Sequence, residues 1–139
     1  MSKEYKTDVD GNNAPIKYGV DIEVTASKTL SYEESGSRQN VGTDALVITL
    51  PPTKEGVEYI IRNTGADGNN IITLSPDAND AIFGTVANAA ADSVASGVVD
   101  KDIVNTKATS NKGDFIKLVG DGVDGWYIEG GVGIWASEA

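Results

Sequence analysis

Apolar and polar residues alternate over short runs through most of the chain beyond residue 20. In the runs ALVITL (45–50), VEYIIR (57–62) and FIKLV (115–119), every second position is apolar. A strand places alternate side chains on opposite faces, so each run predicts a strand with one buried face. Further strands are predicted over 21–26, 29–33, 70–74, 103–109, 126–129 and 133–136, where β-branched and aromatic residues are frequent.

The same alternation predicts which side chains form the core. Apolar residues two positions apart in a strand share a face, and burying that face removes apolar area from water. The predicted core residues are Leu46, Ile48, Leu50, Val57, Tyr59, Ile61, Ile72, Leu74, Ile116, Leu118, Trp126 and Ile128.

Gly, Asn, Asp and Pro separate the predicted strands. NTGADGNN (63–70) predicts a hairpin turn, and GDGVDG (120–125) predicts a second, glycine-rich hairpin with no following helix to make a phosphate loop. Segment 76–102 is rich in small residues that would bury little area. We therefore expect a long surface excursion there, with a helical turn or two as the alternative.

Short strands with turn signals between them are typical of an all-β fold. We predict a single antiparallel β-sandwich, jelly-roll-like, over residues 21–139, with a barrel as a related arrangement. Residues 1–20 lack a sustained helix or strand period and contain Gly11, Asn12, Asn13 and Pro15. This segment predicts an extended N-terminal arm, with a disordered tail as the alternative.

Histidine and cysteine are both absent from the 139 residues. Their absence removes the proton shuttle that works near neutral pH, the thiolate nucleophile and the commonest transition-metal ligands. Hydrolysis by paired carboxylates or by a Ser-Lys arrangement remains chemically possible, but no local motif nominates residues for either. The sequence therefore predicts a protein that is not an enzyme and that uses no cofactor.

The charge balance argues against nucleic acid and anionic membranes as partners. Asp and Glu number 21 against 11 Lys and Arg, which gives a net charge of −10, and the basic residues are scattered singly. Phosphate groups are repelled by such a surface. No run approaches the roughly 20 apolar residues that span a bilayer, and residues 1–10 are polar rather than signal-like.

Several acidic motifs have two interpretations. The turns 8–12, 67–69 and 121–124 carry carboxylates of the kind that bind Ca²⁺, but none follows the twelve-residue EF-hand frame. We interpret them as Asx-type turns, with a loose calcium site as the alternative. Glu33 and Glu34 are interpreted as a solvated strand end rather than a catalytic dyad, because adjacent strand residues point to opposite faces.

Aromatic residues gather near the C-terminal end, at Trp126, Tyr127 and Trp135. Such side chains fill cores, anchor protein interfaces or stack on sugar rings. We expect Trp126 in the core. For Trp135, core packing and an exposed interface both remain open.

Six motifs together resemble small β-rich virion proteins of tailed bacteriophages. They are ALVITLP (45–51), GxxYxIxNxGADG (56–68), NTKAT (105–109), GDFIKLVGDG (113–122), GWYI (125–128) and IWA (134–136). The head decoration, or cement, proteins are the family that the set resembles most. The likeness extends over about residues 29–136 and leaves the N-terminal segment uncovered.

This resemblance implies a jelly-roll-like domain that binds the outer surface of the capsid and bridges neighbouring major capsid protein subunits. It also implies a homo-oligomer, either a dimer or a trimer, made in the host cytoplasm and located on the outside of the virion. It implies no catalytic, cofactor-binding or metal-binding residues.

We predict subunit contacts at apolar residues of the arm and of the C-terminal end, namely Tyr5, Ile16, Tyr18, Ile134 and Trp135. The alternative function is a tail-fibre or appendage module that binds carbohydrate in the manner of a lectin, with Trp135 stacked on sugar. A glycosidase that uses two carboxylates is a third hypothesis, and no spacing nominates its acid pair.

Overall fold

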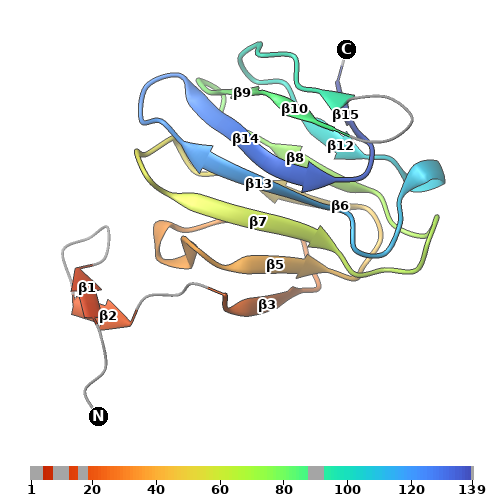
Figure 1. Cartoon of the computed structure of the whole chain (residues 1–139), viewed down its shortest axis with the longest axis horizontal. Helices are drawn as coiled ribbons and strands as arrows, with labels where there is room; N and C mark the ends of the chain where they lie inside the picture. The colour runs from red at the N-terminus through yellow and green to blue at the C-terminus, as the bar shows by residue number, and fades with distance from the viewer. Residues whose placement is uncertain (1–4, 8–12, 16–18, 88–92, 139) are drawn as a thin grey trace.

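The computed structural model describes residues 5–7, 13–15, 19–87 and 93–138, and this part of the chain is all-β with almost no helix. Its strands form two mixed sheets that lie one in front of the other (Figure 1), an arrangement consistent with a β-sandwich. The expected all-β class is therefore confirmed. The two short 3₁₀ helices are η1 (Tyr32–Glu34) and η2 (Lys107–Thr109).

The first sheet has six strands, in the order β3 (Asp21–Val24), β5 (Arg38–Val41), β7 (Glu58–Asn63), β13 (Phe115–Gly120), β14 (Gly125–Val132) and β9 (Ala81–Phe83). The second has five, in the order β15 (Trp135–Ser137), β12 (Ile103–Asn105), β8 (Ile72–Ser75), β6 (Leu46–Thr49) and β4 (Lys28–Thr29). Two small ribbons pair β1 (Tyr5–Thr7) with β2 (Asn13–Pro15), and β10 (Thr85–Val86) with β11 (Ser93–Val94).

From β3 to β9, each strand crosses to the sheet opposite the one before it. Two crossings return the chain to its first sheet in the same direction, so β3, β5 and β7 pair in parallel, and so do β4, β6 and β8. The expectation of a purely antiparallel sandwich is therefore wrong. A jelly roll is also built from antiparallel strands, so these pairings do not confirm the jelly-roll-like order.

The two predicted hairpins have different outcomes. Segment 63–70 joins β7 to β8, which lie in different sheets, so it is a crossover and not a hairpin. The prediction was wrong because alternation reveals which face is buried and says nothing about which sheet a strand joins. Segment 120–125 does form an antiparallel hairpin between β13 and β14, with a bulge between Lys117 and Leu118.

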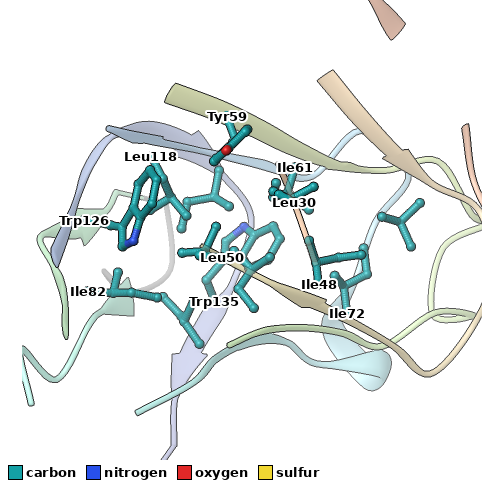
Figure 2. Packing of buried hydrophobic residues seen from close by; sticks show 14 of the residues in the cluster. Leu30, Ile48, Leu50, Tyr59, Ile61, Ile72, Ile82, Leu118, Trp126 and Trp135 are labelled. Carbon is teal, nitrogen blue, oxygen red and sulfur yellow. The ribbon is translucent and has the colours of Figure 1, made fainter. Parts of the chain in front are cut away.

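The core lies between the two sheets and draws on strands from β3 to β15 (Figure 2). Eleven of the twelve predicted core residues are buried there, and Ile128 is partly buried against the cluster. Trp126 and Trp135 are both fully buried. The ring of Trp126 contacts that of Tyr59, with their centroids 5.5 Å apart.

Four parts of the strand prediction need correction. The strand predicted over 103–109 ends at Asn105 as β12, and η2 follows it at Lys107–Thr109. β4 ends at Thr29, and residues 32–34 form η1 instead of continuing the predicted strand. β5 was not predicted, because its sequence RQNV is polar. The predicted surface excursion of 76–102 contains β9, which joins the six-stranded sheet, and the β10–β11 ribbon, while residues 88–92 lie outside the described residues.

The predicted N-terminal arm is described only at β1 and β2. These strands pair antiparallel with each other, and Tyr5 lies opposite Pro15. They belong to neither large sheet (Figure 1). The rest of residues 1–18 lies outside the described residues, so the extended arm stays a prediction.

Candidate protein-binding face

The outward face of the six-stranded sheet follows from alternation along its strands. In β7, Tyr59, Ile61 and Asn63 are buried, so Glu58, Ile60 and Arg62 point outward. In β13, the outward residues are likewise Phe115, Lys117 and Val119. A solvated sheet face is ordinarily polar, yet this one carries apolar and aromatic side chains in its middle strands.

A shallow hollow of about 170 Å³ lies on this face and is lined by Arg38, Ile60, Arg62 and Phe115. The sheet register explains the grouping, because Arg38 pairs with Ile60 and Arg62 pairs with Phe115 on adjacent strands. The chain has two arginines, and both line this hollow. The arginines of an otherwise acidic protein are thus gathered around an apolar centre.

Both guanidinium groups contact the carboxylate of Asp21 on the edge strand β3. Arg38 Nε donates to Asp21 Oδ1 at 2.6 Å, and Arg62 Nη2 reaches the same oxygen at 3.4 Å. The hydrogen bond from Arg38 is the main reason that the pKa of Asp21 lies below its ordinary value. The same contact raises the pKa of Arg38. Asp21 is nevertheless exposed, with 47% of its side chain accessible.

Apolar side chains continue on either side of the hollow. Val132, which is 52% exposed, lies opposite Phe115. Further along, the rings of Phe83 and Tyr127 stack with centroids 5.2 Å apart, and Tyr127 pairs with Val119. We call the outward side chains of the six-stranded sheet, from Asp21 across to Phe83, the arginine face.

A charged row divides the arginine face into two apolar patches. Lys117 Nζ lies 3.8 Å from a carboxylate oxygen of Glu58 and 3.9 Å from one of Glu129. The patch on one side is the hollow with Val132, and the patch on the other is the stacked aromatic pair. Alternating apolar and paired charged groups are the composition of many protein interfaces, with Arg and aromatic residues at their centres.

The outward face of the five-stranded sheet is different in the described strands. Its register places Val47, Thr73, Val104 and Ala136 in one row across β6, β8, β12 and β15. These side chains are small and carry no charge, and no aromatic ring lies among them. The two outward faces of the molecule are therefore chemically distinct.

The structure describes the side chains of two of the five predicted contact residues, Ile134 and Trp135. Trp135 is fully buried and donates its indole N–H to the carbonyl of Val132 at 3.1 Å, so the structure shows the core alternative rather than an exposed contact. Ile134 is half-buried, and its carbonyl accepts a hydrogen bond from buried Asn105. The side chain of Tyr5 is not described, and Ile16 and Tyr18 lie outside the described residues.

Of the two acidic turns within the described structure, 121–124 forms the predicted Asx-type turn, whereas the carboxylate of Asp67 bonds to a distant part of the chain. The carboxylate of Asp121 accepts hydrogen bonds from the backbone N–H groups of Val123, Asp124 and Gly125 at 2.8–3.0 Å. These bonds hold the pKa of Asp121 below its ordinary value, and the bond from Gly125 has the largest effect. Asp67 accepts from the N–H of Lys112. Residues 8–12 lie outside the described residues.

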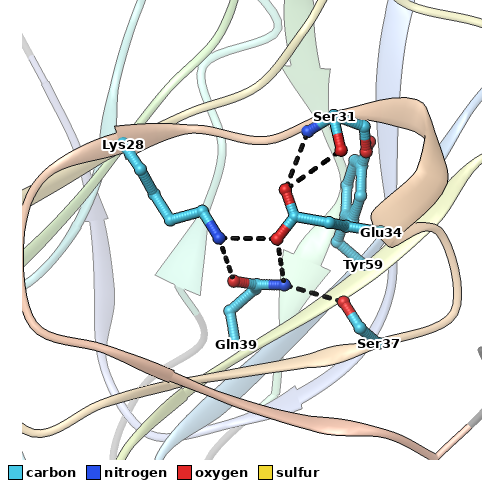
Figure 3. A network of polar contacts seen from close by, with 6 residues as sticks. All are labelled: Lys28, Ser31, Glu34, Ser37, Gln39 and Tyr59. Atoms are coloured by element: carbon cyan, nitrogen blue, oxygen red, sulfur yellow. Dashed lines mark hydrogen bonds and ion pairs between the residues drawn. The ribbon is translucent and has the colours of Figure 1, made fainter.

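Glu34 is part of a polar network and not a solvated strand end (Figure 3). Its carboxylate accepts from Lys28 Nζ at 2.5 Å and from the N–H of Ser31 at 3.0 Å. Gln39 is fully buried. It accepts a hydrogen bond from Lys28 Nζ and donates to Ser37 Oγ and to the carboxylate of Glu34. Glu33 and Glu34 both belong to η1, so the assumption that they continue a strand was the error.

Among residues 19–87 and 93–138, no group of three or more acidic side chains is placed to hold a metal ion. The same residues include no helix long and apolar enough to cross a membrane. No protein-family model matches this chain, and no curated protein shows significant similarity to it. The interpretation of the arginine face therefore depends on its own chemistry.

A signal for the arginine face is present in the sequence but is easily overlooked. In VEYIIR and FIKLV, the residues out of phase with the core are Ile60, Phe115 and Val119. An apolar residue at an outward position is informative, because a polar side chain there would be hydrated and would not expose apolar area to water. That both arginines come to one hollow depends on strand order, which the sequence did not reveal.

Proposed function

We propose that this chain is a non-enzymatic virion structural protein: a capsid decoration, or cement, protein of a tailed bacteriophage. In this proposal it binds the outer surface of the capsid, bridges major capsid protein subunits and stabilises the head. The observation that carries the proposal is the arginine face. It exposes aromatic, aliphatic and arginine side chains to water, and exposed apolar groups gathered in this way are typical of surfaces that bind another protein.

The role that we propose for this face is binding through buried surface area and not catalysis. A protein contact of standard size buries about 800 Å² on each partner. The net charge of −10 disfavours nucleic acid, so the packaged genome would not compete for the protein. The resemblance of the sequence motifs to decoration proteins points to the same role.

The proposal extends to the assembly. The protein acts as a homo-oligomer, a dimer or trimer, on the outside of the virion after synthesis in the host cytoplasm. Residues 1–20 form an arm that lies along a neighbouring subunit and adds contact area there. The jelly-roll-like strand order is proposed only because the sequence resembles the decoration proteins. The binding proposal does not require it.

Co-sedimentation with capsids that lack this chain tests the proposal. We expect saturable binding at a fixed ratio to the major capsid protein, together with a higher disruption temperature of the particles, because a ligand of the assembled state stabilises it by mass action. Purified chain that stays in the supernatant at every concentration would refute the decoration role.

A carbohydrate-binding tail-fibre or appendage module is the second candidate, and one observation favours it. Tyr127 is 43% exposed beside Phe83, so an aromatic platform is present even though Trp135 is buried. A glycan-binding assay separates the two candidates. Saturable binding that is lost in Tyr127→Ala, without binding to capsids, would replace the decoration proposal with this one.

A further inference from the structure

The contact of Asp21 with the two arginines indicates what the arginine face recognises. Two guanidinium groups from β5 and β7 converge on one carboxylate oxygen, which is the geometry of a carboxylate clamp. The bond of Arg62 Nε to Asn40 Oδ1 at 2.9 Å and the bond of Arg38 Nη2 to the carbonyl of Gly19 at 2.9 Å hold both side chains in place. The clamp is therefore formed in advance of any partner.

Asp21 is a weakly held occupant of this clamp. It lies on an edge strand with 47% of its side chain accessible, and each arginine side chain is 34% accessible. Ion pairs between such exposed groups contribute little to folding, because water and salt screen them. A carboxylate that also brings apolar contacts can displace Asp21 at small cost.

The floor beside the clamp supplies those apolar contacts. Ile60 and Phe115 line the same hollow of about 170 Å³ as the arginines, and Val132 extends it. In an extended chain, side chains two residues apart point the same way, so one can enter the hollow while the other meets the clamp. A phosphate polyanion fits less well than a single carboxylate, because Glu23 and Glu58 lie on the same face on strands β3 and β7 and the chain has a net charge of −10.

We propose that the hollow between Arg38, Ile60, Arg62 and Phe115 binds an extended segment of a partner protein that carries a carboxylate two residues from a large apolar side chain. Asp21 occupies the clamp in the free protein and is displaced on binding. The inference rests on the proposed function only in taking the partner to be a protein, and it names the feature of the partner that is recognised.

Nuclear magnetic resonance of the arginine side chains tests this directly, since the chain has only two arginines and therefore two Nε–H signals. The probe is the peptide acetyl-Ser-Asp-Ser-Leu-Ser-amide, and its Asn counterpart is the control. We expect both signals to shift saturably with the Asp peptide and not with the Asn peptide. We also expect Asp21→Asn to tighten binding about two- to fivefold, because it removes the internal competitor.

Asp44→Asn is the matched control variant. Asp44 is a half-buried aspartate with a lowered pKa; its carboxylate pairs with Lys107 and accepts from the N–H of Ile71, and its loss changes the net charge equally. It should leave peptide affinity unchanged. If the arginine signals of Asp21→Asn do not respond, or respond equally to both peptides, the inference is wrong. This outcome is independent of capsid co-sedimentation, so failure of the clamp and failure of the decoration role are distinguishable.

Discussion

Gly113 and Gly133 have the same backbone angle, φ = 99°, which L-residues with a side chain rarely adopt. Their surroundings differ. A Cβ at Gly113 would meet nothing within 4 Å, whereas a Cβ at Gly133 would collide with the carboxyl group of Asp114. Asp114 is 2% exposed and accepts a hydrogen bond from buried Asn105, which in turn bonds to buried Asn63. Gly133 therefore makes room for a buried polar cluster between the sheets.

The two glycines form a matched pair for a stability measurement. We expect Gly113→Ala to cost roughly 1 kcal/mol of unfolding free energy from backbone strain alone. Gly133→Ala should cost an additional ~1–3 kcal/mol, because Asp114 must shift and leave buried partners unsatisfied. Urea unfolding of both variants measures the difference. Equal losses would mean that the cluster around Asp114 yields easily.

At the scale of elements, strands with clear apolar alternation were predictable and polar ones were not. β6, β7 and β13 agree with the predicted runs to within a residue at each end. β5 was missed because its inward Gln39 is polar, and the sequence did not show that Lys28 and the nearby Ser37 would satisfy its hydrogen bonds. The pairing of β3, β5 and β7 was beyond prediction, because alternation is the same in a strand with parallel or antiparallel neighbours.

The network around Glu34 joins elements of opposite sheets, since Lys28 belongs to β4 and Gln39 to β5. Burial acts to raise the pKa of Glu34, but the hydrogen bonds from Lys28 and Ser31 outweigh it, so the pKa lies below its ordinary value of 4.5. A lowered pKa in the folded state means that the carboxylate stabilises the fold above pH 4.5 and that this contribution is lost as the pH falls through the lowered value.

Glu34→Gln isolates this effect. We expect the wild type to be more stable than the variant above about pH 4.5, and the gap to narrow as the pH falls, because protonated Glu34 and the glutamine that replaces it are both neutral. Comparing the two proteins cancels the opposite influence of Asp80 and Asp102, whose pKa values are raised mainly by burial. Thermal unfolding between about pH 3 and pH 7 measures the gap, and a gap independent of pH would contradict the assignment.

At the scale of the whole molecule, the outward faces of the two sheets differ in the side chains they expose, and the net charge of the chain does not indicate this difference. Composition predicted an acidic surface, and the predicted contacts were placed on the arm and at Ile134 and Trp135. The structure buries Trp135 and gathers both arginines on the six-stranded sheet. Strands far apart in sequence supply this face, with Arg38 on β5 and Phe115 on β13. The sequence therefore shows the outward apolar residues of single strands, but not that both arginines gather beside them.

Two exposed valines test the central claim that the arginine face binds the capsid. Val132 is 52% exposed on that face, and Val47 is 39% exposed on the outward face of the five-stranded sheet. A buried unpaired charge costs several kcal/mol at an interface, so Val132→Glu should reduce capsid co-sedimentation by at least about tenfold, while Val47→Glu should bind like the wild type. Equal binding by all three proteins, or loss only in Val47→Glu, would contradict the account.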